Sequence, residues 1–120
     1  MEFSLPDELT EIRAAVRDLC AGFPGEYWRS LEPDRYPEEF VRALTEGGWL
    51  AALIPEEYGG VGLGLTAASV ILEEINASGG NAGACHAQMY TMGTLLRHGS
   101  DEQKGRYLPK IGRASCRERV

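Results

Sequence analysis

Six apolar side chains near the beginning of the chain recur with the period of an α-helix. Successive members are separated by four, three, four, three and four residues, and they are Leu5, Leu9, Ile12, Val16, Leu19 and Phe23. This spacing puts one apolar stripe along about five helical turns. Ser4, Pro6 and Asp7 are typical of a helix start, because the serine hydroxyl can accept a hydrogen bond from a free backbone N–H and proline is tolerated in the first turn. The pattern therefore predicts a first helix, which the glycines and proline of residues 21–25 end.

Four later segments carry helix signals of their own. Residues 37–46 open with a proline and two carboxylates and close at a pair of glycines. Residues 66–77 precede a Ser-Gly-Gly stop, and Asn81 can cap a helix that runs to Gly99. Ser100 and Gln103 form a capping box for a fifth helix, which we expect to end before Pro109. We interpret residues 26–35 as a short helical turn plus loop, so the chain is predicted to be all-α with about five helices.

The apolar positions of these helices predict which side chains form the core. They face inward if each helix buries its apolar stripe, and the two methionines among them are interpreted as core filler rather than as ligands. The expected core positions beyond the first helix are Phe40, Val41, Leu44, Val70, Ile71, Leu72, Ile75, Met89 and Met92.

A glycine-rich segment, residues 55–64, separates the second and third predicted helices. It places four glycines within six residues, which indicates an irregular loop where the backbone passes close to another group. A tight interhelical loop is the favoured interpretation. A phosphate cradle is the alternative, but no strand precedes the glycines, and neither the dinucleotide-binding spacing nor a P-loop lysine is present.

Charge and hydropathy exclude several functional classes. The 120 residues carry 18 acidic and 12 basic side chains, and residues 1–60 alone have a net charge of −8. Because no basic stripe is available to neutralise phosphates, we expect no nucleic-acid partner. No apolar run is long enough for a membrane span, and the first residues lack the layout of a signal peptide, so we expect a cytoplasmic protein.

The cysteines indicate reduced thiols rather than disulfides. Cys20, Cys85 and Cys116 are an odd number at wide spacing, without a Cys-x-x-Cys pair. No cluster of side chains offers four ligands at zinc spacing, so we predict no metal site.

Three sequence motifs, in the same order along the chain, resemble those of the N-terminal helical domain of the acyl-CoA dehydrogenases. Residues 50–64 (LAALIPEEYGGVGLG) look like the family's Pro-Glu-Glu-x-Gly-Gly-x-Gly loop. Residues 71–75 (ILEEI) look like the helix that follows this loop in the family. Residues 98–109 (HGSDEQKGRYLP) resemble the family's next motif along the chain. The resemblance covers residues 4–110 and implies an all-α domain over residues 1–110, with about five helices in an orthogonal or up-down bundle.

The resemblance also implies what the whole protein does. Acyl-CoA dehydrogenases are FAD-dependent oxidoreductases that desaturate acyl-CoA thioesters, as in fatty acid metabolism. They hold FAD and the catalytic base mainly in a middle β domain and a C-terminal helical domain, so this chain should contain neither catalytic nor cofactor-binding residues and should be inactive alone. A homo-oligomer and an electron-transfer partner are expected of the full-length enzyme.

Within this resemblance, four residues look like those that line the far end of the acyl chain: Ala82, Gly83, His86 and Tyr90. Small residues at a helix start leave room for a ligand, so the choice of chain length becomes a matter of volume. His86 and Tyr90 are more polar than a simple apolar tunnel requires. The alternative for His86 is an ordinary helix residue satisfied by one hydrogen bond.

Other residue pairs suggest chemistry but do not fit it. Glu73 and Glu74 point about 100° apart on a helix, so we interpret them as a solvated face rather than an acid/base pair. Cys85 and His86 diverge in the same way and lack a third, orienting group. We interpret His98, next to Gly99, as a helix C-terminal cation.

Residues 111–120 change abruptly to a basic and polar composition. Their sequence looks like a translated sequencing adaptor, so we expect a non-native tail, with the natural protein continuing after Lys110.

Two alternatives to the function as an acyl-CoA dehydrogenase remain. One is a fragment of a related flavoenzyme, of the flavin monooxygenase or nitroalkane-oxidising type, and the other is a non-catalytic helical interaction module.

Overall fold

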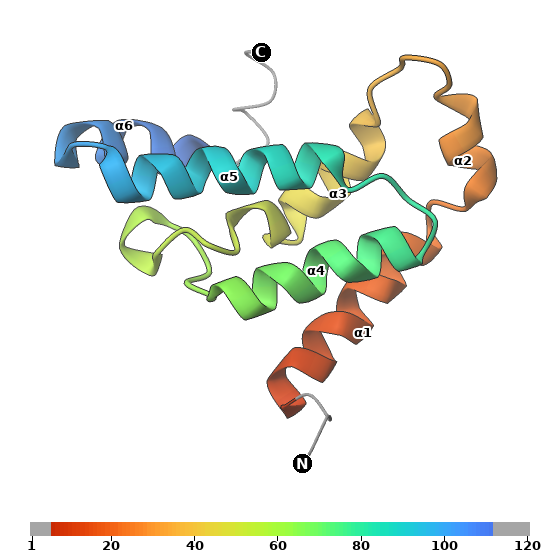
Figure 1. The fold of residues 1–120 in the computed structure, drawn as a ribbon, viewed down its shortest axis with the longest axis horizontal. Coiled ribbons are helices and arrows are strands. Elements are labelled where there is room, and N and C mark those ends of the chain that lie inside the picture. The colour runs from red at the N-terminus through yellow and green to blue at the C-terminus, as the bar shows by residue number, and fades with distance from the viewer. Residues whose placement is uncertain (1–5, 112–120) are drawn as a thin grey trace.

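The computed structural model describes residues 6–111, and these residues contain six α-helices, two short 3₁₀ helices and no strand (Figure 1). The all-α prediction is therefore confirmed. In chain order the elements are α1 (Asp7–Ala21), α2 (Gly25–Ser30), α3 (Glu38–Glu46), η1 (Trp49–Ala51), η2 (Glu56–Tyr58), α4 (Leu65–Ala77), α5 (Gly83–His98) and α6 (Asp101–Ile111). The helix beyond the expected five is α2, which the sequence indicated only as a helical turn.

The apolar stripe of α1 is buried against α4, which crosses it in Figure 1. Ile12, Val16 and Cys20 are buried on the α1 side, and Leu9, Leu19 and Phe23 are partly buried. The core continues between α3, α4 and α5. Every expected core position beyond the first helix is buried there except Leu72, which is partly buried.

Helix ends follow the capping signals in most places. Gln103 donates its backbone N–H to the Ser100 hydroxyl at 3.1 Å, and its side-chain oxygen accepts from the Ser100 N–H at 2.9 Å. This reciprocal pair is the predicted capping box of α6. Ala82, not the predicted Asn81, occupies the N-cap position of α5, although the Asn81 side chain accepts a hydrogen bond from the Gly83 N–H at 2.7 Å. The predicted role of Ser4 in starting α1 lies outside the described residues.

One predicted boundary is wrong, because α6 continues through Pro109 to Ile111. Proline disfavours a helical conformation in the residue before it and removes one backbone donor. Leu108, the residue before it, is fully buried and is held by the core in a helical conformation. The lost backbone bond lies in the last turn of α6, so it weakens only the end of the helix.

The glycine-rich segment is an interhelical loop that closes on its own backbone. The N–H groups of Val61, Gly62 and Leu63 donate to carbonyl oxygens of residues 51–54 at 2.7–3.1 Å. Gly60 lies so close to Ile54 that a Cβ atom would overlap the Ile54 carbonyl oxygen. The close approach predicted from the glycines is therefore an approach to the chain's own backbone.

A cluster of four aromatic rings holds α2 against α3 and against the loop that follows α1. The Phe23 ring lies 5.3 Å from Phe40, and Trp28 lies 4.9 Å from Phe40, both edge to face. Trp28 also donates its indole N–H to the Phe23 carbonyl at 3.0 Å, and Tyr27 donates its hydroxyl to Glu39 at 3.0 Å. These contacts give a six-residue helix the tertiary support that it lacks by itself.

Candidate functional site

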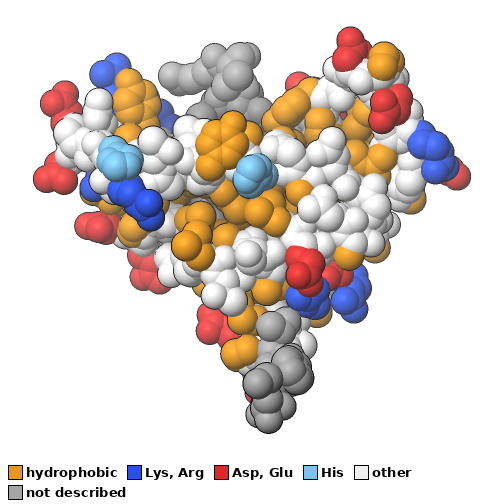
Figure 2. Space-filling model, in the orientation of Figure 1, with side chains coloured by type: hydrophobic (Ala, Val, Ile, Leu, Met, Phe, Trp, Pro, Cys, Tyr) orange, Lys and Arg blue, Asp and Glu red, His pale blue; other side chains and the backbone are white. Residues whose placement is uncertain are grey.

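Helix α5 has one buried face and one face that no described element covers. At 100° per residue, positions 83, 90 and 97 fall on nearly the same line, and positions 86, 93, 94 and 98 flank it. We call this set the outer face of α5; it consists of Gly83, His86, Tyr90, Gly93, Thr94, Arg97 and His98. All are exposed except Gly93, which is partly exposed. Figure 2 shows both histidines on this side of the molecule.

The two aromatic side chains of the outer face contact each other. The His86 and Tyr90 rings lie 5.3 Å apart between centroids at an interplanar angle of 67°, an edge-to-face arrangement. Tyr90 is 60% exposed, a large value for a ring that is partly covered by its neighbour. The two rings thus form an exposed aromatic pair that also carries hydrogen-bonding groups. The pair begins about one helical turn after Gly83, which has no side chain.

The structure brings together three of the four residues predicted to line a substrate pocket. Gly83, His86 and Tyr90 share the outer face, whereas Ala82 is buried in the core at 6% exposure. The Ala82 carbonyl accepts the His86 N–H at 2.8 Å in the first turn of α5. Ala82 therefore lies behind the outer face and supports it from the core side.

A hollow of about 250 Å³ continues the outer face toward the C-terminal end of α5. Its walls are formed by Tyr90, Gly93, Thr94, Arg97 and His98. The Thr94 hydroxyl donates to the Tyr90 carbonyl at 2.9 Å. Sequence reasoning missed this hollow, although the seven-residue spacing from Gly83 through Tyr90 to Arg97 was a signal that could have located it.

Comparison with known proteins connects this helical arrangement with a family. Residues 6–115 match the family model described as "Acyl-CoA dehydrogenase, N-terminal domain". The chain belongs to the acyl-CoA dehydrogenase family. The match extends past Lys110, while the predicted domain boundary at that residue and the foreign origin of residues 111–120 stay predictions.

Curated acyl-CoA dehydrogenases resemble the chain over nearly its whole length. "Probable acyl-CoA dehydrogenase fadE25" of Mycobacterium leprae is 37% identical over an alignment of 112 residues that covers 91% of this chain and 28% of the relative. "Glutaryl-CoA dehydrogenase" of Desulfococcus multivorans is 37% identical over an alignment that is 123 positions long with its gaps and covers 95% of this chain and 31% of the relative. The chain thus spans about a third or less of these relatives' length.

A solved structure shares the fold of this acyl-CoA dehydrogenase domain. The ChsE4–ChsE5 complex from Mycobacterium tuberculosis contains a chain that superimposes with a TM-score of 0.76 at 26% identity. The superposition covers 93% of this chain and 29% of that chain. The predicted fold type, an acyl-CoA dehydrogenase N-terminal helical domain, is confirmed.

Glu73 and Glu74, the adjacent carboxylates of this dehydrogenase domain, form ion pairs with arginines of α1. Glu74 accepts hydrogen bonds from Arg17 at 2.6 Å and Arg13 at 2.9 Å, and its side chain is only 6% exposed. Hydrogen bonding from Arg17, followed by that from Arg13, lowers the Glu74 pKa despite its burial. The solvated-face interpretation was therefore wrong for Glu74, although the Glu73 side chain is 67% exposed and pairs with Arg13 at 2.7 Å.

The sulfur-containing side chains of α5 belong to the core. Cys85 is buried, and desolvation raises its pKa to about 12, so no reactive thiolate forms at neutral pH. Met89 and Met92 are buried as well, which confirms them as core filler. None of the three side chains reaches the outer face.

A cleft of about 490 Å³ lies beside the glycine-rich loop, the segment for which a phosphate cradle was the alternative interpretation. It is lined by Leu53, Pro55, Glu56, Glu57, Gly62 and Leu63. Two carboxylates would repel the pyrophosphate of FAD, and no lysine or arginine lines the cleft to neutralise it. The described residues of this cleft therefore do not fit FAD, and the expectation that other polypeptide holds it stays a prediction.

Residues 6–111 were compared with the requirements of a metal site and of a membrane-spanning helix. This range contains no group of three or more His, Cys, Asp or Glu side chains arranged to hold a metal ion. None of its helices is both long and apolar enough to cross a membrane. The predicted cytoplasmic location is not tested by this finding.

Proposed function

We propose that this chain is the N-terminal part of an FAD-dependent acyl-CoA dehydrogenase and that the outer face of α5 forms part of its acyl-pocket wall. The observation that carries the proposal is the exposure of Gly83, His86 and Tyr90 on one helix face within a domain of this family. The acyl-CoA and glutaryl-CoA substrates in the relatives' names support a CoA thioester as the substrate class.

The wall acts through volume and the exclusion of water. Gly83 carries no side chain in the first turn of α5, where the Asn81 amide lies against it, and the rings of His86 and Tyr90 narrow the next turn. Each acyl methylene that is buried against such a wall contributes about 0.8 kcal/mol, so the position of the rings can select chain length. Ala82, behind the wall, keeps α5 close to the core.

The desaturation itself requires groups from elsewhere in the intact enzyme. A base must remove the α proton, and FAD, when bound, supplies the acceptor for the hydride that leaves the β carbon. This chain's residues contribute binding and shielding, and the isolated chain should turn over no substrate. A homo-oligomeric enzyme and an electron-transfer partner are part of the same proposal.

The direct test uses the full-length protein, produced from the natural gene. Anaerobic addition of acyl-CoA thioesters of graded length should bleach the absorbance of its bound flavin. A purified flavoprotein that no acyl-CoA reduces would contradict the proposal and favour a related flavoenzyme. A full-length protein that binds no flavin would favour the interaction module.

A pair of matched variants tests the pocket wall. We predict that Tyr90→Ala shifts the preferred acyl chain length and changes kcat/KM severalfold, because it removes an exposed ring from the wall. Tyr107→Ala is the control, since Tyr107 is also exposed, at 46%, but lies on α6. Steady-state kinetics across the acyl-CoA series measures both. Equal profiles for the two variants would remove α5 from the pocket.

A further inference from the structure

Beyond the His86–Tyr90 pair, the outer face of α5 borders an open hollow. From Tyr90 to Arg97 the helix rises about 10 Å, and the hollow of about 250 Å³ lies along this stretch. A Cβ atom at Gly93 would meet nothing within 4 Å, so the space above the helix is open there. A ligand that passes Tyr90 would therefore enter the hollow rather than a wall.

The hollow has hydrogen-bond donors and a positive charge, but no carboxylate. Its lining includes the guanidinium of Arg97 and the imidazole of His98, whereas the chain as a whole carries a net charge of −6. The Thr94 proton is already donated to the Tyr90 carbonyl, so the threonine leaves donation to its neighbours. The lining therefore suits an anion better than a methyl group.

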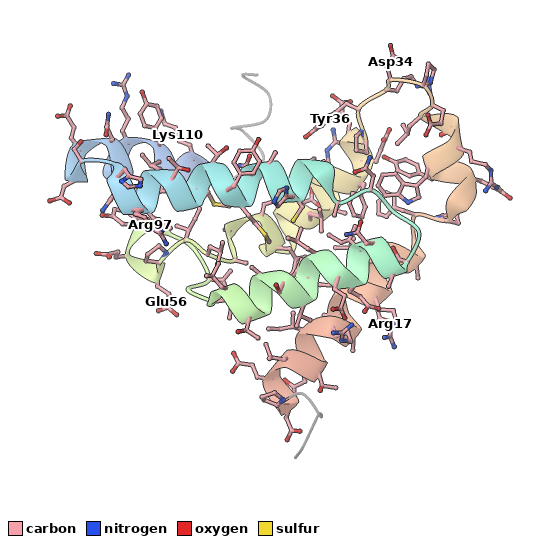
Figure 3. All side chains as sticks on the ribbon, viewed as in Figure 1. Arg17, Asp34, Tyr36, Glu56, Arg97 and Lys110 are labelled. Carbon is pink, nitrogen blue, oxygen red and sulfur yellow. The ribbon has the colours of Figure 1, made fainter. Side chains whose placement is uncertain are left out.

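Arg97 is available for such an anion. No hydrogen bond or ion pair joins its side chain to another residue within 6–111, in contrast to Arg13 and Arg17. Figure 3 labels Arg97 near the C-terminal end of α5. A guanidinium presents a planar fork of donors that matches the two oxygens of a carboxylate.

We propose that this hollow binds a carboxylate at the distal end of a long acyl group, with Arg97 as the specificity-determining residue. The inference rests on the proposed function, because the acyl group must reach the hollow along the outer face of α5. The substrate class is then a CoA thioester whose acyl group carries a terminal carboxylate and is long enough to pass Tyr90 by about 10 Å.

The test compares two acyl-CoA thioesters of equal length, one ending in a carboxylate and one in a methyl group, with the full-length flavoenzyme. We expect the wild type to favour the carboxylate by about tenfold or more in kcat/KM, and Arg97→Met to lose that preference. Arg42→Met is the matched control, because Arg42 is exposed on α3 and lines neither the hollow nor the cleft beside the glycine-rich loop.

The ratio between the two substrates is measured within each variant, so a change in folded fraction cancels. An unchanged ratio in Arg97→Met, or a wild-type preference for the methyl-ended substrate, would overturn the inference. Flavin reduction by the methyl-ended thioester would still support the proposed function in either case. If Arg97 only offsets the dipole of α5, the variant will lower the Tm and leave the ratio unchanged.

Discussion

Two regions of the domain use arginine in opposite ways. At the α1–α4 junction, Arg13 and Arg17 are paired with the buried carboxylate of Glu74. On the outer face of α5, Arg97 lines an open hollow without a described partner. The comparison teaches that a charge satisfied inside the domain stabilises the fold, whereas a charge left unsatisfied beside a hollow is available for a ligand.

The largest expected difference between the two regions is in apolar packing. Ile71 on α4 is fully buried, so Ile71→Ala should lower the free energy of unfolding by about 2–5 kcal/mol. Tyr90→Ala should change it by no more than about 0.5 kcal/mol, because the ring is 60% exposed. Urea unfolding of the 120-residue chain measures both. Similar losses for the two variants would mean that the outer face is part of the core.

A smaller loss in the free energy of unfolding is expected when an ion pair between α1 and α4 is removed. Glu74→Gln keeps the shape of the side chain but removes the charge that two arginines contact, and we expect a loss of about 2 kcal/mol. Glu73→Gln, at an exposed carboxylate, should cost less than about 0.5 kcal/mol. Equal urea midpoints for the two variants would show that burial does not distinguish these neighbouring residues.

The smallest expected effect is the change in stability with pH that arises from the contact of Glu74 with Arg13 and Arg17. Because the folded-state pKa of Glu74 is lowered, its contribution is complete above the unfolded-state pKa of about 4.3 and is lost as the pH falls through the lower folded-state value. Wild type should therefore lose more stability than Glu74→Gln between about pH 6 and pH 3. Parallel urea midpoints for the two proteins across this range would contradict the lowered pKa.

Local patterns were sufficient to predict most of the fold. The spacing of the α1 stripe and the Ser100–Gln103 capping box depend on residues close in sequence, so they could be interpreted without coordinates. The stability of α2 depends on Phe40, a residue on another helix, and the last turn of α6 depends on the burial of Leu108. Such tertiary support overrides local propensity and could not be predicted from local patterns.

The candidate site was predicted in part for the same reason. Gly83, His86 and Tyr90 share a face because helical geometry fixes their spacing. Which face of α5 is exposed depends on its packing against η1 and α6, so the burial of Ala82 required the structure. Glu74 could have been connected with α1, since Arg13 and Arg17 are four residues apart on one side of that helix.

The division between Ala82 and Gly83 has a consequence for how such a domain can diversify. Enlarging Ala82 would crowd the core beneath α5, whereas the exposed side chains of His86 and Tyr90 can be exchanged with little cost to folding. Under the proposed function, single substitutions at His86 or Tyr90 would change the acyl preference while the core remains intact. On the same proposal, the evolution of a new specificity would exchange surface residues on one helix and leave the inherited framework unchanged.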